Sequence, residues 1–289
     1  MKFALFFGCT IPASLGQYES SARAVSKKLG LELVDIGEFN CCGYPMRNLH
    51  LKASVLASAR NLALAEKVNL NIMTLCQCCY GSLKKADHLM KEDASLRKEI
   101  NNTLEKEGLK YEGGIEVMHL LSVLHKSIGV EVVKDKITRS YKGLKIAAHY
   151  GCHALRPSSV VQFDDPVAPT VFDELVVLTG AESIYWPTRL ECCGAPVAGI
   201  NNDLAMDLTE KKLTDGKQSG ADYLCAACPF CYIQFDAVGK MIPSEREKDH
   251  HLPPILYPQL LGLSMGIDSR ILGLERSRTD APGIERFLS

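Results

Sequence analysis

The chain has 289 residues, of which 46% are hydrophobic and 23% are charged, the composition of a globular protein that can bury a core. Its 33 Lys and Arg residues balance 34 Asp and Glu residues, and the net charge of −1 gives no reason to expect nucleic acid or an acidic membrane surface as a partner. No run of 18 apolar residues occurs, so we expect no insertion into a membrane.

Twelve cysteines are the unusual feature of this composition. We expect the protein to be cytoplasmic, where thiols stay reduced, and there so many cysteines indicate metal or redox chemistry rather than structural disulfides. The apolar run Phe3–Phe7 is too short for the core of a signal peptide. A similar segment, Leu144–Tyr150, recurs deep inside the chain, so we interpret both as buried strands.

Strands and helices are predicted to alternate in the first 90 residues. Amphipathic patterns predict helices at Ser20–Leu29 and Lys52–Val68, and a third helix, Tyr80–Met90, is expected after Cys79. Each predicted strand leads into cysteines: Phe3–Phe7 to Cys9, Leu31–Ile36 to Cys41-Cys42-Gly43, and Leu70–Leu75 to Cys76-Gln77-Cys78-Cys79.

The same elements recur in the same order in the second half of the chain. Helices are predicted at Thr170–Thr179, Asp203–Ser219 and Tyr232–Met241. The strands again precede cysteines: Leu144–Tyr150 leads to Cys152, Ala181–Trp186 to Cys192-Cys193-Gly194, and Ala221–Ala227 to Cys228-Pro229-Phe230-Cys231. Three elements repeated at a nearly constant offset indicate a duplicated domain, and the long period excludes a solenoid.

This pattern predicts an α/β fold with two pseudo-symmetric halves, each a mostly parallel sheet flanked by helices. We place the N-terminal domain at 1–142 and the C-terminal domain with its tail at 143–289. The polar segment Val132–Lys145 is expected to link the halves, and the charged stretch Ala94–Gly108 to be a solvated helical face. Because ligands gather at the carboxyl ends of parallel strands, distant cysteines of each half should meet there.

The number of cysteines in each half constrains the centre that they bind. Each half offers one cysteine after a strand, a vicinal pair and a Cys-x-x-Cys. Five thiolates exceed the four that saturate tetrahedral zinc or an ordinary cubane cluster, so a larger or distorted iron–sulfur cluster is expected in each half. A helix N-terminus after Cys79 and Cys231 would favour the thiolate form.

The doubled pattern of a lone cysteine, Cys-Cys-Gly-x-Pro and Cys-x-x-Cys resembles the cysteine-rich CCG domain found in the B subunit of heterodisulfide reductase, and the resemblance covers nearly the whole chain. The resemblance implies two noncubane 4Fe–4S clusters, each held by five cysteines. Carried over to this sequence, one set is Cys9, Cys41, Cys42, Cys76 and Cys79, and the other is Cys152, Cys192, Cys193, Cys228 and Cys231.

The resemblance also implies an activity and partners. It implies reduction of the mixed disulfide of coenzyme M and coenzyme B to two thiols, with electrons that come from a flavin-containing subunit through a ferredoxin-like subunit. Two alternatives stay open: a related protein that acts on another disulfide or a persulfide carrier, and an electron-transfer protein with zinc in one half. The chain lacks a dinucleotide-binding Gly-x-Gly-x-x-Gly after a strand, so we expect it to bind no flavin itself.

Side chains beside the cysteines are further candidates. His153 follows Cys152 directly and is predicted to be the catalytic proton donor or a substrate contact, with a structural hydrogen bond as the alternative. Arg47 and Arg156 suit sulfonate, carboxylate or phosphate groups, or are plain surface residues. His149 is expected to be a core residue. The two remaining cysteines, Cys78 and Cys225, are expected to be buried, inert thiols.

Overall fold

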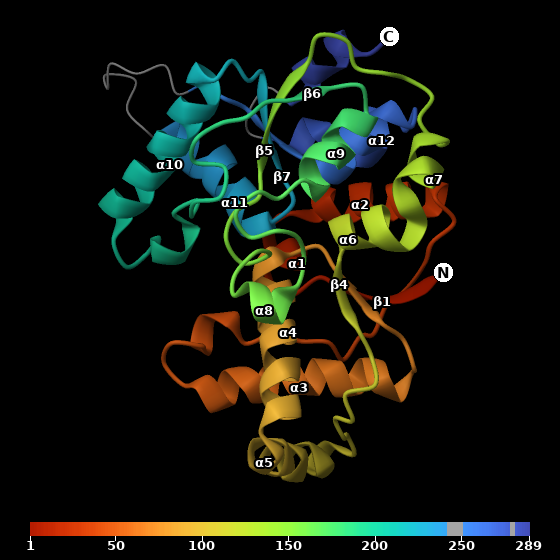
Figure 1. The fold of residues 1–289 in the computed structure, drawn as a ribbon, viewed down its shortest axis with the longest axis vertical. Coiled ribbons are helices and arrows are strands. Elements are labelled where there is room, and N and C mark those ends of the chain that lie inside the picture. Colours follow the sequence, from red (N-terminus) through yellow and green to blue (C-terminus); the bar gives the residue numbers. More distant parts are fainter. Residues whose placement is uncertain (242–250, 278–280) are drawn as a thin grey trace.

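The computed structural model describes residues 1–241, 251–277 and 281–289. Two four-stranded sheets, each entirely parallel, form the centres of the two halves. Figure 1 shows β5, β6 and β7 of the second sheet in the upper part of the molecule, with β1 and β4 of the first sheet below them. The predicted α/β architecture of two similar halves is confirmed.

The two sheets have the same topology. The first has the order β2-β1-β3-β4 and the second the order β6-β5-β7-β8. Ala4 at the centre of the first sheet pairs with Val34 on one side and with Ile72 on the other. The strands are β1 Lys2–Phe6, β2 Glu32–Val34, β3 Ile72–Thr74, β4 Val117–His119, β5 Lys145–His149, β6 Glu182–Ser183, β7 Tyr223–Ala226 and β8 Pro254–Leu256.

Helices connect these parallel strands, as parallel pairing requires. They are α1 Thr10–Ser14, α2 Gly16–Lys28, α3 Leu51–Lys67, α4 Gln77–Glu92, α5 Ala94–Leu104, α6 Leu120–Ser122, α7 Val130–Lys134, α8 Ser158–Val161, α9 Val171–Leu178, α10 Asn202–Gln218, α11 Pro229–Ile233, α12 Tyr257–Ser264 and α13 Ser269–Leu272. Two π-helical stretches, Val123–Gly129 and Gln234–Val238, follow α6 and α11.

Several helix boundaries differ from the prediction. Helix α2 begins four residues earlier than expected, at Gly16. Helix α4 begins at Gln77 rather than after Cys79, so that cysteine lies inside the first helical turn. Part of the expected linker is helical, as α7, and Tyr141 in the remainder is buried and bridges to Leu288. Strands β4 and β8 were not predicted, because neither leads into a cysteine motif and three residues are too few to show a clear period.

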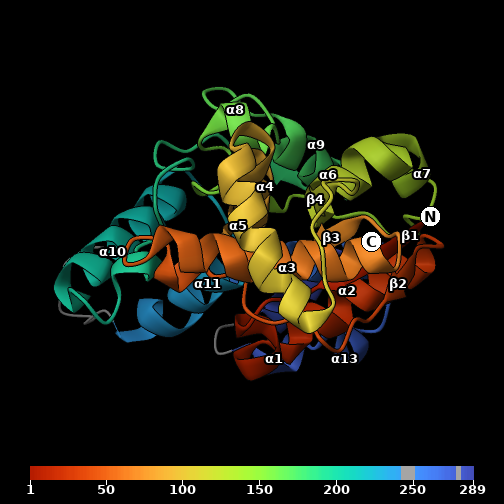
Figure 2. The same cartoon turned by 90° about the horizontal axis from the view of Figure 1, so that it is seen from below.

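The halves pack on one another through equivalent pairs of helices. Helix α2 of the first half lies against α12 and α13 of the second, while α9, which corresponds to α2, lies against α6 and α7 of the first. Figure 2 shows α6, α7 and α9 side by side. Likewise, α4 contacts α8 and α11 contacts α1. Each half therefore completes the packing of the other, and the carboxyl ends of both sheets face a shared interior.

Candidate metal centres

The cysteines of both proposed sets follow the carboxyl ends of neighbouring strands, either in the loop or in the first turn of the next helix. In the first half they follow β1, β2 and β3; in the second they follow β5, β6 and β7. In the first sheet, β2 and β3 lie on opposite sides of β1, so the connections after β1 lead to opposite sides of the sheet. The cysteines lie at the point where the strand order reverses in this way. Open parallel sheets bind ligands at this position.

The Cys-Cys-Gly turns have a fixed backbone path. Gly43 has a φ of +80°, and a Cβ there would lie 2.7 Å from the carbonyl oxygen of Ser54, so only glycine fits between the turn and α3. Helix α3 also holds the turn, because the Ser58 hydroxyl donates to the Cys42 carbonyl at 2.6 Å. In the second half, Thr209 donates to the Cys193 carbonyl at 3.2 Å. Both vicinal cysteine pairs are therefore held by equivalent contacts.

The first Cys-x-x-Cys lies at the N-terminus of a helix. Cys76 is the N-cap residue of α4, and its Sγ accepts the backbone N–H of Cys79 at 3.5 Å. The helix dipole and these free N–H groups stabilise negative charge on sulfur. Cys228 occupies the corresponding N-cap position before α11.

Within each set the thiols form a chain of contacts. The Sγ atoms of Cys9 and Cys41 are 3.9 Å apart. Hydrogen bonding from Cys41, and then from Cys79, lowers the pKa of Cys42 to about 3. In the second half, hydrogen bonding from Cys152, and then from Cys193, lowers the pKa of Cys192 to about 2. The same hydrogen bonds raise the pKa of the partner thiols Cys41 and Cys152, so each set concentrates one negative charge, on Cys42 or Cys192. A cationic metal centre requires such deprotonated thiols.

The two sets meet between the halves. The Sγ atoms of Cys76, Cys78 and Cys228 all lie within 4.8 Å of one another, although Cys228 comes from the other half. Cys78 was expected to be an inert thiol, yet its Sγ also lies 3.6 Å from Nδ1 of His153. The run Cys-x-Cys-Cys was the feature of the sequence that could have indicated a functional role for Cys78. Cys225, in contrast, is fully buried within β7, and burial alone raises the pKa of its thiol.

His153 lies at this junction with a defined tautomer. Its Nε2 lies 2.8 Å from Nη1 of Arg47, and a guanidinium can only donate, so Nε2 accepts and Nδ1 carries the hydrogen. Nδ1 is 3.3 Å from the Sγ of Cys152 and therefore donates toward sulfur. Burial, and then the charge of Arg47, lowers the pKa of His153, which keeps the ring neutral. Arg47 stacks at 4.3 Å on the ring of Tyr44.

A basic cavity of about 90 Å³ opens beside His153. Arg47, Lys85 and Arg156 line it, and they come from the first Cys-Cys-Gly loop, from α4 and from the loop after Cys152. The Arg156 side chain donates to the Leu190 carbonyl at 3.0 Å. The structure thus brings together both arginines singled out from the sequence and adds Lys85, whose position on α4 carried no signal.

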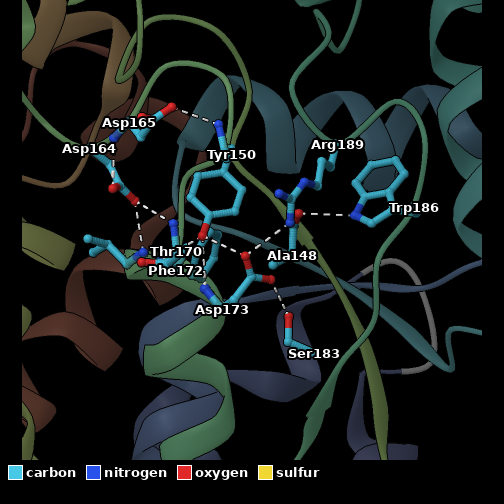
Figure 3. A network of polar contacts seen from close by, with 12 residues as sticks. Ala148, Tyr150, Asp164, Asp165, Thr170, Phe172, Asp173, Ser183, Trp186 and Arg189 are labelled. Carbon is cyan, nitrogen blue, oxygen red and sulfur yellow. Dashed lines mark hydrogen bonds and ion pairs between the residues drawn. The ribbon is translucent and has the colours of Figure 1, made fainter.

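A polar network holds the segments that lead to Cys152 and Cys192 (Figure 3). The hydroxyl of Tyr150 donates to Asp173 at 2.7 Å, and Arg189 donates to the same carboxylate at 3.1 Å. The indole N–H of Trp186 donates to the Ala148 carbonyl at 3.1 Å. Strand β5 and the loop before Cys192 are therefore tied together and to α9.

Two buried polar side chains accompany the second set. His149 is fully buried at the end of β5, as expected for a core residue, but neither ring nitrogen has a hydrogen-bond partner in the described part of the protein. Lys212 of α10 donates to the Thr188 carbonyl and lies 4.8 Å above the Trp186 ring. Burial lowers the pKa of Lys212 to about 8. Lys212 could not be singled out from the sequence, because a helix pattern does not reveal which lysine faces inward.

These features fit a metal centre in each half. The donors are thiols at the ends of rigid strands, and a Cβ on Gly8 would lie only 2.7 Å from the Sγ of Cys79, so the strand end closely approaches the sulfurs. His149 adds an unpartnered nitrogen beside the second set. Two cysteine-rich sites are present, consistent with metal clusters.

A model of the cysteine-rich CCG domain matches residues 3–84 and again residues 146–236. The chain belongs to this family. It is 36% identical to the B subunit of a ferredoxin/F(420)H(2)-dependent CoB-CoM heterodisulfide reductase of Methanosarcina acetivorans, over 96% of this chain and 93% of that protein. It is 32% identical to a protein of Archaeoglobus profundus that is described as like the B subunit of heterodisulfide reductase, over 93% of this chain and 92% of that protein. The family of iron–sulfur oxidoreductases expected from the motifs is thereby confirmed.

Other relatives have different names. The chain is 33% identical to the membrane anchor of the 8-methylmenaquinol:fumarate reductase of Wolinella succinogenes, over 97% of this chain and 98% of that protein. None of the helices in the described ranges is both long and apolar enough to cross a bilayer. A hypothetical protein from Helicobacter pylori shares the fold, with a TM-score of 0.76 at 18% identity, over 96% of this chain and 51% of that one.

Proposed function

We propose that the chain is the disulfide-reducing B subunit of a heterodisulfide reductase, with two noncubane 4Fe–4S clusters held by the five-cysteine sets of its halves. The observation that carries this proposal is the meeting of the two sets across the interface, at Cys76, Cys78 and Cys228. Two centres that face one space suit a substrate with two sulfur atoms. When bound, the clusters would supply the two electrons that open the S–S bond.

We propose the heterodisulfide of coenzyme M and coenzyme B as the substrate. The relatives named as parts of CoB-CoM heterodisulfide reductases support this choice. The cavity lined by Arg47, Lys85 and Arg156 supports an anionic substrate, because guanidinium and ammonium groups bind sulfonate, carboxylate and phosphate oxygens. Another anionic disulfide, or a persulfide on a carrier protein, would use the same cavity.

The residues around the junction would bind and orient this substrate. An acidic group held by Arg156 and Lys85 would place the disulfide beside His153. The Nδ1–H of His153 would donate a hydrogen bond to a sulfur as that sulfur gains negative charge. Arg47 keeps the hydrogen on Nδ1, because it occupies Nε2. Reduction consumes two electrons and two protons and yields two thiols.

The proposed setting is cytoplasmic, in a complex with a flavin-containing subunit plus a ferredoxin-like subunit. Relatives named as parts of multisubunit reductases support a role within a larger assembly. Electrons would pass from the flavin through the ferredoxin-like protein to the clusters of this chain.

Anaerobic analysis of iron, acid-labile sulfide and zinc tests the centres first. We expect roughly eight irons per chain and no stoichiometric zinc. About four irons with one zinc would instead support an electron-transfer protein with zinc in one half. The iron-loaded chain should then reduce the CoB-CoM heterodisulfide with an artificial reductant. A chain with the full iron content that does not reduce this heterodisulfide would refute the proposed substrate, and other disulfides would then be tested.

A further inference from the structure

The imidazole of His149 is a buried group without a protein partner. Its side chain is fully inaccessible, and both Nδ1 and Nε2 lack a hydrogen bond in the described part of the chain. Buried ring nitrogens nearly always have a partner, since leaving one unpaired forfeits the hydration that it had in water. Its neighbours in ring contact, Phe235 at 5.0 Å and Trp186 at 6.1 Å, offer aromatic surfaces.

His149 lies next to two proposed cluster ligands. A ring nitrogen of His149 and the Sγ atoms of Cys193 and Cys231 lie within 4.8 Å of one another, and all three residues are buried. A Cβ placed on Gly151 would lie 3.3 Å from Nε2 of His149 and 3.8 Å from Cys231 Sγ. The nitrogen and the sulfurs therefore border the same small space at the end of β5.

The first half has no such group at the corresponding described position. Phe6 ends β1 as His149 ends β5, and in both halves one residue separates it from the Gly-Cys that follows. A Cβ placed on Gly8 would lie 3.8 Å from Cε1 of Phe6, so the phenyl ring occupies the place that the imidazole has in the second half. Phe6 packs edge-on against Phe39 at 5.1 Å. The duplicated fold thus presents a phenyl ring to one set of thiols and a nitrogen to the other.

We propose that His149 directs a ring nitrogen onto the metal centre of the second half, which makes the two centres of this chain chemically different. The nitrogen acts either as a metal ligand or as the N–H donor to a sulfur of the centre. In both cases the first centre has sulfur donors alone, while the second has a mixed nitrogen and sulfur environment. This inference rests on the proposed function only in requiring a metal in the second half.

The test uses the full chain loaded anaerobically with ferrous iron and sulfide, and labelled with ¹⁵N only at histidine. Pulsed EPR in a paramagnetic oxidation state should show coupling to a nitrogen of His149, in addition to a weak coupling from His153, whose Nδ1–H donates to Cys152. A large His149 coupling identifies a ligand, and a small one identifies an N–H···S bond. The His149 coupling should disappear in His149→Phe while that of His153 remains; phenylalanine is the residue that the first half has at this position, Phe6. The variant Phe6→His should add a further coupling, from the first centre.

A neighbouring histidine provides the matched control. His153 lies near Cys152, a different thiol of the second set, so His153→Gln should lose the weak coupling of His153 and retain the coupling of His149. Loss of all histidine coupling in His153→Gln, or a spectrum of His149→Phe with the same histidine couplings as the wild type, would overturn the proposal. If zinc fills the second half, X-ray absorption at the zinc edge should show a nitrogen at about 2.0–2.1 Å in wild type and not in His149→Phe.

The outcomes separate the two proposals. Metal in the second half without a nitrogen partner refutes this inference and leaves the proposed function standing. Absence of metal from the second half refutes both. The spectrum of the first centre reports on folding, because it should be unchanged in His149→Phe.

Discussion

Replacement of Gly8 by alanine tests how closely strand β1 approaches the first set of thiols. Gly8 has a φ of +69°, which costs an L-residue about 1–2 kcal/mol. The new Cβ would lie 2.7 Å from Cys79 Sγ. Ordinary contact needs roughly 3.5–4.0 Å, so the sulfur must move by about 1 Å within a buried site, at about 1–3 kcal/mol more. We expect Gly8→Ala to lose about 2–5 kcal/mol of unfolding free energy.

Gly30 provides the control for this experiment. Its φ of +71° matches that of Gly8, but a Cβ there meets no atom within 4 Å. Gly30→Ala should therefore lose only about 1–2 kcal/mol and keep its full iron content. Gly8→Ala should also lose the iron of the first half, because Cys79 is displaced. Denaturant unfolding of the metal-free chains and anaerobic iron analysis measure the two effects. Equal stability and equal iron in both variants would refute the reasoning.

Three further variants test other parts of the site. Cys193→Ser should lose or spectrally alter the iron of the second half alone in a folded chain, and unchanged iron, spectrum and activity would contradict the ligand set. Burial lowers the pKa of Lys212 to about 8 from an unfolded value near 10.4, which destabilises the metal-free chain at pH 7 by about 3 kcal/mol. Lys212→Met removes this effect but also loses the hydrogen bond to Thr188 and the contact with Trp186, worth about 1–2 kcal/mol, so it should stabilise the chain by a net of about 1–2 kcal/mol. The destabilisation by the charge is complete below about pH 8 and fades as the pH rises toward about 10.4, so the stability advantage of the variant should be lost at high pH; a stability difference that does not change with pH would argue against this reasoning. Lys85→Gln, at an exposed position, should raise the KM for an anionic disulfide roughly 2–5-fold and leave the iron content unchanged, whereas an unchanged KM would remove the cavity from the substrate site.

The duplicated cysteine pattern was readable from the sequence because its parts are local. A short apolar run followed by Gly-Cys, or a Cys-Cys-Gly turn, specifies a strand end or a tight turn within a few residues. The repetition of these parts in order predicted two similar halves, and the alternation of strands and helices predicted parallel sheets. Cysteine spacing and number indicated metal chemistry. The family comparison confirmed the duplicated CCG domain, and the ligand sets stay predictions for the iron analysis.

Only the tertiary structure decided how the halves meet. The exchange of helix contacts, α2 with α12 and α9 with α7, joins segments far apart in the chain, and no local pattern encodes such pairs. The role of Cys78 was likewise not predictable from the sequence. It lies between the two cysteines of the first Cys-x-x-Cys and was expected to be inert, yet it contacts Cys228 across the interface. His149 and Lys212 reach the second set because a strand end and a helix face point inward there. The cysteine motifs of the site could be predicted because each is encoded by a few neighbouring residues. The presence of His149 and Lys212 beside the second set could not, because burial and contact depend on how distant segments pack.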